Sequence, residues 1–255
     1  MEWFAVVVSL IVLWIASLCK ILHTSTNKGG ALINKNVLLV IAHPDDESMF
    51  FSPTISFLIS RGNNLHILCL SIVVELHYLG DADGLGNTRK DELCRACAVL
   101  QVPLQQVKVL NHPELQDGFG LVWDHNLLAQ IIEEEVSAHE INMIITFDKY
   151  GVSGHCNHRD VHYGVRKVMH HIPQRSIDAW ELVSINILRK YSGPVDIWLS
   201  MLFAITSKGT HCLQNEHTSR SFHAMAAHSS QWVWFRKLFV SFSSYTYVNS
   251  LRKIN

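Results

Sequence analysis

Two short segments of this chain carry residues whose types and spacing could perform metal-dependent chemistry. The first segment reads Ala42-His43-Pro44-Asp45-Asp46-Glu47 and follows an apolar run. In it His43 and Asp46 stand three residues apart, so both side chains could reach one metal ion. The alternative is that the three acids are only helix N-terminal residues, which the helix macrodipole favours. That alternative explains the acids but not the His-Pro pair before them.

The second segment, Gly154-His155-Cys156-Asn157-His158, contains two histidines three positions apart. In a chain with 16 histidines these two could be ordinary surface residues. Together the two segments offer three metal ligands, His43, Asp46 and His158, and leave a fourth position for water. Three protein ligands plus water are typical of a catalytic zinc site rather than a structural one. Zinc lowers the pKa of its bound water to near neutrality.

Two side chains beside these ligands remain for acid–base chemistry. Asp45 is adjacent to one expected ligand, and His155 lies one helical turn from another. Amide hydrolysis needs a base that activates the water and a group that stabilises the tetrahedral oxyanion. The two segments therefore predict a hydrolytic metal site.

Both segments follow apolar, β-branched runs that we expect to be buried strands, at residues 37–41 and 141–147. Apolar periodicity predicts further strands at residues 65–71 and 107–110 and helices at residues 48–60, 88–100, 126–139 and 161–170. Strands that alternate with helices indicate a Rossmann-like, three-layer α/β/α domain with a mainly parallel sheet. In such folds ligands bind beyond the carboxyl ends of the strands, where both segments are expected.

The N-terminal segment is apolar enough to cross a membrane. Between residues 3 and 19 the only polar residues are two serines, and about 20 apolar residues suffice to span a bilayer. The alternative is a cleaved signal peptide, but no positive charge precedes the apolar run and no clear cleavage site follows it. We therefore expect a transmembrane anchor at residues 1–23, a linker at residues 24–34 and a catalytic domain at residues 35–255. Because Lys20 and Lys28 follow the apolar run, the positive-inside rule places that domain in the cytosol.

Composition excludes some classes of protein. With 48% hydrophobic residues the 255-residue chain can bury a sizeable core, and a net charge of −1 argues against a nucleic-acid-binding protein. Cys94 and Cys97 form one C-x-x-C pair with no second pair to complete a zinc site. We expect this pair to lie on a helix in a reduced compartment rather than to act as a redox motif.

The two segments resemble the signature of the LmbE-like family of zinc-dependent de-N-acetylases, A-H-P-D-D-E followed later by H-x-x-H. The resemblance runs from about residue 35 to the C-terminus and includes residues 88–93 (TRKDEL), 184–191 (SINILRKY) and 228–236 (HSSQWVWFR). It is strongest to the anchored eukaryotic branch, which acts on N-acetylglucosaminyl-phosphatidylinositol (GlcNAc-phosphatidylinositol) at the cytosolic face of the endoplasmic reticulum. That branch performs the second step of glycosylphosphatidylinositol-anchor synthesis.

The resemblance implies a role for each matching residue. His43, Asp46 and His158 would bind Zn²⁺, although Fe²⁺ or another divalent metal can share such ligands. Asp45 would be the general base, and His155 would polarise the substrate and stabilise the oxyanion. The expected partners are the glycolipid substrate and the endoplasmic reticulum membrane. A deacetylase of another N-acetylglucosaminyl conjugate and a non-catalytic membrane homologue remain as alternatives.

Two further residues match the family pattern less specifically. Arg89 would contact the substrate or, as an alternative, hold the loop above the site. Asp117 would contact the substrate or only shape a turn. The resemblance assigns no role to His228, for which we expect packing or support of the site. Residues 232–237 would form a core face with exposed cations or, alternatively, meet the membrane. The short apolar run at residues 198–205 would be core or lipid-facing.

Residues 72–79 (IVVELHYL) depart from the family pattern, which has a short loop here. We expect that deleting them preserves or raises de-N-acetylation, because both ligand segments lie outside the deletion. The deletion variant would be compared with the unchanged chain in acetate release and in yield of folded protein. A clear loss of folded protein would contradict this expectation.

Overall fold

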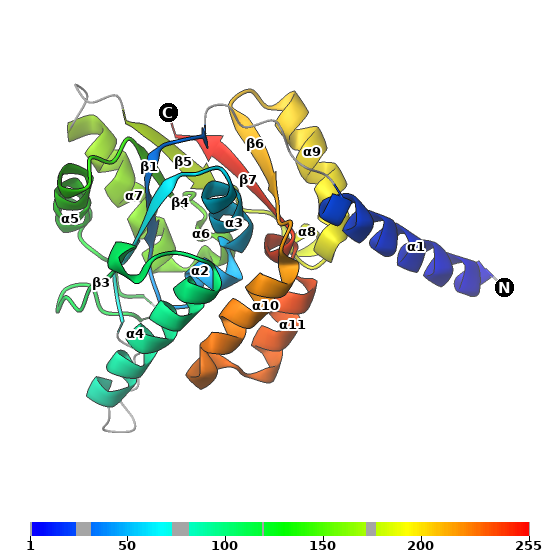
Figure 1. The fold of residues 1–255 in the computed structure, drawn as a ribbon, viewed down its shortest axis with the longest axis horizontal. Coiled ribbons are helices and arrows are strands. Elements are labelled where there is room, and N and C mark those ends of the chain that lie inside the picture. Colours follow the sequence, from blue (N-terminus) through cyan, green and yellow to red (C-terminus); the bar gives the residue numbers. More distant parts are fainter. Residues whose placement is uncertain (1, 24–31, 73–81, 119, 172–176, 255) are drawn as a thin grey trace.

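A seven-stranded sheet organises the part of the chain that follows the first helix (Figure 1). The computed structural model describes residues 2–23, 32–72, 82–118, 120–171 and 177–254. The strand order is β3-β2-β1-β4-β5-β7-β6. The strands are β1 (Asn36–Ile41), β2 (Asn64–Cys69), β3 (Val107–Val109), β4 (Met143–Phe147), β5 (Asp178–Leu182), β6 (Thr210–Gln214) and β7 (Val248–Lys253).

The first five strands pair in parallel, and β7 joins β5 and β6 in antiparallel pairs. Helices cover both faces of the sheet, with α5 beside α7 on one side and α3 and α4 on the other (Figure 1). This arrangement confirms the expected α/β fold with a mainly parallel sheet. The helices are α1 (Glu2–His23), α2 (Asp46–Met49), α3 (Ser52–Ser60), α4 (Ala82–Val99), α5 (His125–Ala138), α6 (Gly151–Gly154), α7 (Cys156–His171), α8 (Ile187–Lys190), α9 (Asp196–Thr206), α10 (Thr218–Ala227) and α11 (Trp234–Phe242). Short 3-10 turns lie at η2 (Leu104–Gln106), η3 (Gly193–Val195), η4 (Ser229–Gln231) and η5 (Ser244–Thr246).

The centre of the sheet is the core of the domain. Residues 37–41 of β1 and the whole of β4 are buried, as is usual for parallel strands covered by helices on both faces. Trp123 and Phe51 are among the largest fully buried side chains. This rigid centre ends at the two segments that carry the candidate ligands.

The structure corrects three element predictions. The expected helix at residues 48–60 is two helices, α2 and α3, because Pro53 lacks an N–H and its ring clashes with a preceding turn of helix. The expected loop at residues 148–157 contains α6, and α7 begins at Cys156 rather than at residue 161. Helix α4 begins at Ala82, before the expected start at residue 88. The four predicted strands are confirmed, with ends shifted by one or two residues.

Among the described residues, one helix is long and apolar enough to span a membrane, Trp3–Ile21 within α1. It supports a single N-terminal anchor. Residues 24–31 of the expected linker and residues 73–79 of the expected insertion lie outside the described residues. Cys94 and Cys97 lie on α4 and are free thiols, and burial raises the pKa of Cys97 well above its usual value.

Candidate metal centre

The candidate site lies where the chain reverses its direction of travel across the sheet. From β1 the chain runs outward through β2 to β3, then returns to place β4 on the other side of β1. In open α/β folds ligands bind at such a point, beyond the carboxyl ends of the two strands. Residues 42–47 follow β1, and residues 148–158 follow β4, so the topology brings the two predicted segments together.

The loop after β1 is held in a strained conformation. Asp45 has φ +125°, a backbone conformation that residues other than glycine rarely adopt. The backbone N–H of Asp45 donates to Glu47 Oε2 at 3.0 Å. Asp46 Oδ2 accepts from the backbone N–H groups of Ala42 at 3.1 Å and His43 at 2.9 Å. Such strain persists only where surrounding contacts enforce it, and it clusters at functional sites.

A buried aspartate shapes the loop after β4. Asp148 Oδ1 accepts from the N–H groups of Tyr150 at 3.0 Å and Gly151 at 3.1 Å, and its Oδ2 accepts from Ser184 N–H at 2.8 Å. The turn carries the Gly151 carbonyl to 3.1 Å from His158 Nδ1. The His158 ring also stacks on Phe147, with centroids 4.0 Å apart and planes 1° from parallel. The position of His158 is therefore defined from two sides.

Replacing Gly151 by alanine should weaken metal binding. Gly151 has φ +63°, and a Cβ there would stand 2.9 Å from His158 Cβ. The clash would push His158 off its position, and we expect zinc affinity to fall by about 10- to 100-fold, as for other residues that orient metal ligands. Zinc titration of the Gly151→Ala variant measures this effect. Gly120→Ala is the matched control, since its φ is also positive but a Cβ there meets nothing within 4 Å. Equal affinities of the two variants would contradict the prediction.

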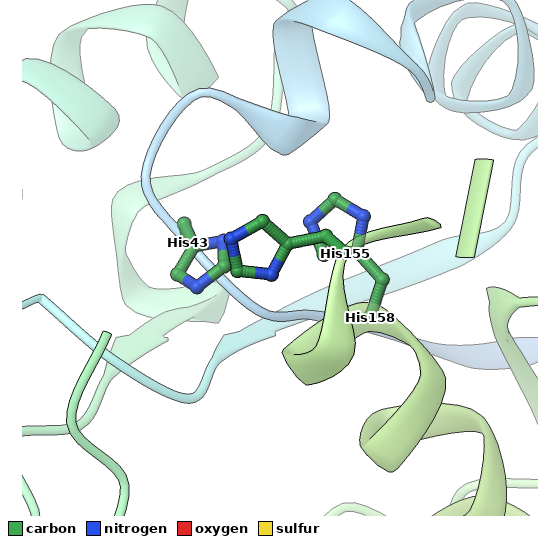
Figure 2. Close-up of side chains that lie close together, drawn as sticks. All are labelled: His43, His155 and His158. Carbon is green, nitrogen blue, oxygen red and sulfur yellow. The ribbon is translucent and has the colours of Figure 1, made fainter. Parts of the chain in front are cut away.

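Three imidazoles meet at this site (Figure 2). The ligand nitrogens of His43, His155 and His158 lie within 4.8 Å of one another. The ring centroid of His43 is 4.8 Å from that of His155 and 5.4 Å from that of His158. The two histidines of the second segment therefore converge on the histidine of the first, as their spacing suggested.

The hydrogen bonds of His158 indicate that a cation belongs here. Since the Gly151 carbonyl can only accept, His158 Nδ1 must donate, and a neutral ring then carries its lone pair on Nε2. That Nε2 is buried without a hydrogen-bond partner among the described residues and lies 3.2 Å from Asp46 Oδ1. A lone pair facing a carboxylate is unfavourable unless a positive charge lies between them.

His43 repeats this arrangement on the other side of Asp46. Its Nε2 lies 3.1 Å from Asp117 Oδ1 and 3.2 Å from Asn157 Oδ1. Its Nδ1 faces Asp46 Oδ2 at 3.9 Å. Each imidazole is thus held by a hydrogen-bond partner at one nitrogen, and its second nitrogen faces the Asp46 carboxylate. Two such imidazoles and one carboxylate match the donor set of a divalent metal such as zinc. The residues present therefore fit a metal ion.

The electrostatics of the site also favour a cation. Burial alone would raise the pKa of Asp46, but its interactions with the adjacent His158 and His43 outweigh burial and lower that pKa to about 2. Burial opposes protonation of His43, yet its hydrogen bond to Asp117 and the charges of Asp46 and Asp117 raise its pKa. A proton and a metal ion thus compete for the same electron-rich position. Burial and the two neighbouring histidines lower the pKa of His155 to about 4, so His155 is neutral at pH 7.

Arg89 and Asp117 lie beside the ligands. Arg89 is buried and donates to the Pro44 carbonyl at 3.2 Å and to Gln231 Oε1 at 2.8 Å. Its other terminal nitrogen lies 3.6 Å from Asp117 Oδ2. This geometry favours the interpretation that Arg89 holds the loop after β1. The Asp117 side chain keeps 19% of its surface exposed, so it is open to a ligand. Substrate contact by either residue stays a prediction.

Sequence reasoning did not identify the contacts of two distant partners of the first segment. Asp45 Oδ2 forms an ion pair with Arg236, which projects from α11. Glu47 is fully buried, and its Oε1 lies 2.6 Å from His228 Nε2. His228 thus supports the strained loop, in line with the expected supporting role. The only sequence signal for these partners was that both lie in residues 228–236 (HSSQWVWFR), which resemble the family pattern. The sequence of this stretch does not indicate which residues it contacts.

Comparisons with known proteins agree with the geometry. The PIG-L family profile, described as GlcNAc-PI de-N-acetylase, matches residues 38–169. The chain is 35% identical over 236 residues to the probable N-acetylglucosaminyl-phosphatidylinositol de-N-acetylase of Schizosaccharomyces pombe, which covers 91% of this chain and 92% of the relative. It is 36% identical over 216 residues to the corresponding enzyme of Bos taurus, covering 84% of this chain and 81% of the relative.

Solved structures of low sequence identity share the fold. The N,N'-diacetylchitobiose deacetylase of Pyrococcus horikoshii superposes with a TM-score of 0.63 at 14% identity, covering 94% of this chain and 92% of that one. The zinc-inhibited form of teicoplanin deacetylase superposes with a TM-score of 0.57 at 13% identity, covering 86% and 97%.

Proposed function

Because this chain belongs to the PIG-L family of GlcNAc-PI de-N-acetylases, we propose that it removes the N-acetyl group of GlcNAc-phosphatidylinositol by means of a metal-activated water. The products are acetate and the free amine of glucosaminyl-phosphatidylinositol, and the reaction is a step of glycosylphosphatidylinositol-anchor synthesis. The observation that carries the mechanism is the buried Nε2 of His158, which faces Asp46 without a hydrogen-bond partner among the described residues.

His43, Asp46 and His158 are the proposed metal ligands, and Zn²⁺ is the proposed metal. When bound, the metal supplies a Lewis acid for the acetyl carbonyl and makes hydroxide available near neutral pH. The ligand residues are preorganised, because backbone N–H groups hold one oxygen of Asp46 and the Gly151 carbonyl fixes the His158 ring. Little reorganisation is then needed when the substrate arrives.

Asp45 and His155 divide the proton transfer and charge stabilisation between them. Asp45 takes the proton from the attacking water and passes it to the leaving amine, and its carboxylate is oriented by Arg236. His155 lies against His43 and His158 and is neutral at pH 7, so it stabilises the oxyanion as a hydrogen-bond donor. Asp117 contacts the sugar, and Arg89 keeps the loop and Asp117 in place.

The proposed location is the endoplasmic reticulum membrane, with a single span and the catalytic domain in the cytosol. Helix α1 supplies an apolar stretch, Trp3–Ile21, that is long enough for the span. Lys20 near the end of this stretch and Lys28 after it in the sequence support the cytosolic orientation of the catalytic domain.

Removal of the metal tests this function. Chelation of the full-length protein should reduce acetate release from GlcNAc-phosphatidylinositol vesicles to background, because water without the metal has a pKa about 9 units higher than metal-bound water. Added Zn²⁺ should restore the rate in proportion to the metal bound per chain, measured by elemental analysis. An unchanged rate after complete metal removal would contradict the mechanism. A soluble N-acetylglucosaminyl conjugate cleaved as fast as the lipid would favour the wider substrate class.

A further inference from the structure

The last two turns of α1 are packed against the catalytic domain. Ser17 Oγ accepts a hydrogen bond from Trp198 Nε1 at 2.9 Å, and Lys20 Nζ lies 5.1 Å from the Trp198 ring centroid. Ile21 is fully buried in a cluster with Ile197 and Tyr247. These contacts join the apolar helix firmly to α9 rather than leaving it on a free tether.

The contact reaches further back along α1, to Trp14. A Cβ on Gly193 of η3 would stand 3.2 Å from Trp14 Nε1 and 3.5 Å from the Phe242 carbonyl oxygen. Gly193 therefore lies between α1 and the end of α11. Figure 1 shows α1 leaving the domain between α9 and α11.

The length of α1 then determines how deeply the catalytic domain is inserted into the bilayer. The apolar stretch Trp3–Ile21 has 19 residues, which rise about 28 Å, close to the roughly 30 Å of a hydrocarbon core. Residues 3–13 alone, before the first contact, rise only about 16 Å. If α1 crosses the bilayer, the parts of the domain that flank residues 14–21 must lie within one leaflet.

A domain that is partly inserted into a leaflet needs an apolar surface near the base of α1. Helices α8, α9 and α11, which lie near the base of α1 (Figure 1), expose large apolar side chains that we call the apolar collar; they include Leu188, Trp198, Leu202, Trp234, Phe235 and Leu238. Leu188 is 83% exposed and Trp234 is 72% exposed. This exposure corrects the expectation that the aromatic residues of 232–237 form a core face, and it favours the lipid-facing alternative for residues 198–205. Patches of this kind mark protein or membrane contacts.

Helix α11 has two distinct faces. Trp234, Phe235 and Leu238 are exposed, whereas Phe239 and Val240 are buried. Arg236 turns inward and pairs with Asp45, the proposed general base. One short amphipathic helix therefore connects the exposed apolar surface with the catalytic loop.

We propose that the apolar collar is embedded in the leaflet nearest the catalytic domain, so that α11 lies at the lipid interface. Two observations favour a bilayer as the occupant. The collar residue Trp198 contacts α1 directly, and Lys20 and Trp198 are residue types typical of the membrane interface. The inference rests on the proposed membrane function of α1. It explains how an enzyme can reach a sugar that is attached directly to a lipid headgroup, with α11 beside the substrate.

Acyl-chain photolabelling tests the depth directly. The full-length protein is reconstituted in phosphatidylcholine vesicles that contain a phosphatidylcholine with a diazirine in its acyl chain, then irradiated and mapped by mass spectrometry. We expect label on α9 and α11 as well as on α1. Leu104 of η2 serves as the internal control, because it is 52% exposed but lies beside β3 at the opposite edge of the sheet. Label on α1 alone would overturn the proposal.

A paired substitution tests the consequence for activity. The double variant Phe235→Glu, Leu238→Glu should lose the α11 label and release acetate from vesicle-embedded substrate about tenfold more slowly, because charges at an embedded position are unfavourable. Its rate on a water-soluble glycan analogue should stay within about twofold of that of the matched Leu104→Glu control. Equal losses on both substrates would assign α11 a purely structural role and contradict the proposal. Failure of the unchanged protein to cleave either substrate would contradict the proposed function, while the label would still report the depth.

Discussion

An Asp45→Asn variant is expected to bind zinc as the unchanged protein does and to release acetate about 10²- to 10⁴-fold more slowly, the usual contribution of a general base. The amide is nearly the same size as the carboxylate but cannot accept the proton of the attacking water. The strained turn should survive, since the bond that holds it runs from the Asp45 backbone N–H to Glu47 and does not involve the side chain. The measurement is kcat together with metal content per chain.

A second variant separates the loss of the base from the loss of the ion pair. Asp45→Asn also removes the charge partner of Arg236, whose pKa burial lowers to about 10. Arg236→Met removes the same pair but keeps the carboxylate, so we expect it to retain at least about a tenth of the rate. If the Arg236→Met and Asp45→Asn variants released acetate equally slowly, the loss of rate would come from breaking the ion pair and not from the loss of proton transfer by Asp45. Retention of most activity by Asp45→Asn would contradict its role as the base.

A His228→Ala variant is expected to lose about 1–3 kcal/mol of unfolding free energy, the usual cost of leaving a buried hydrogen-bonding group without its partner. Glu47 is fully buried, and its Oε1 accepts from Ser48 Oγ at 2.6 Å and lies 2.6 Å from His228 Nε2. Without the imidazole, Glu47 Oε1 would keep only its hydrogen bond from Ser48 Oγ, and the carboxylate would remain in the interior. Thermal and denaturant unfolding in detergent measure the loss.

The matched control is His223→Ala, an exposed histidine of α10, which should change stability by less than about 0.5 kcal/mol. If His228→Ala does not fold, His228→Gln keeps a donor for Glu47 and should recover part of the stability. The Glu47 carboxylate also binds the Asp45 N–H, so a folded His228→Ala protein should be slower in acetate release. Equal stabilities of the His228→Ala and His223→Ala proteins would show that the buried pair contributes nothing.

The sequence determined the parts of this protein that depend on neighbouring residues. Apolar runs of residues 37–41 and 141–147 are long enough to make buried strands wherever they pack, and the ligand segments follow them directly in the chain. Once two strands are parallel neighbours, their carboxyl ends meet, so His43 and His158 had to come close. The apolar stretch of α1 is equally local, because a membrane span needs only length and composition.

Only the tertiary structure decided which distant residues complete the site and which apolar residues face outward. Arg236 and His228 reach Asp45 and Glu47 from the far end of the chain, and no local preference selects such partners. The amphipathic pattern of α11 was ambiguous for a related reason: an apolar side chain gains similar free energy from a protein core and from a lipid bilayer. Packing of the rest of the chain left Trp234 and Phe235 exposed on α11 and turned Arg236 toward the catalytic loop.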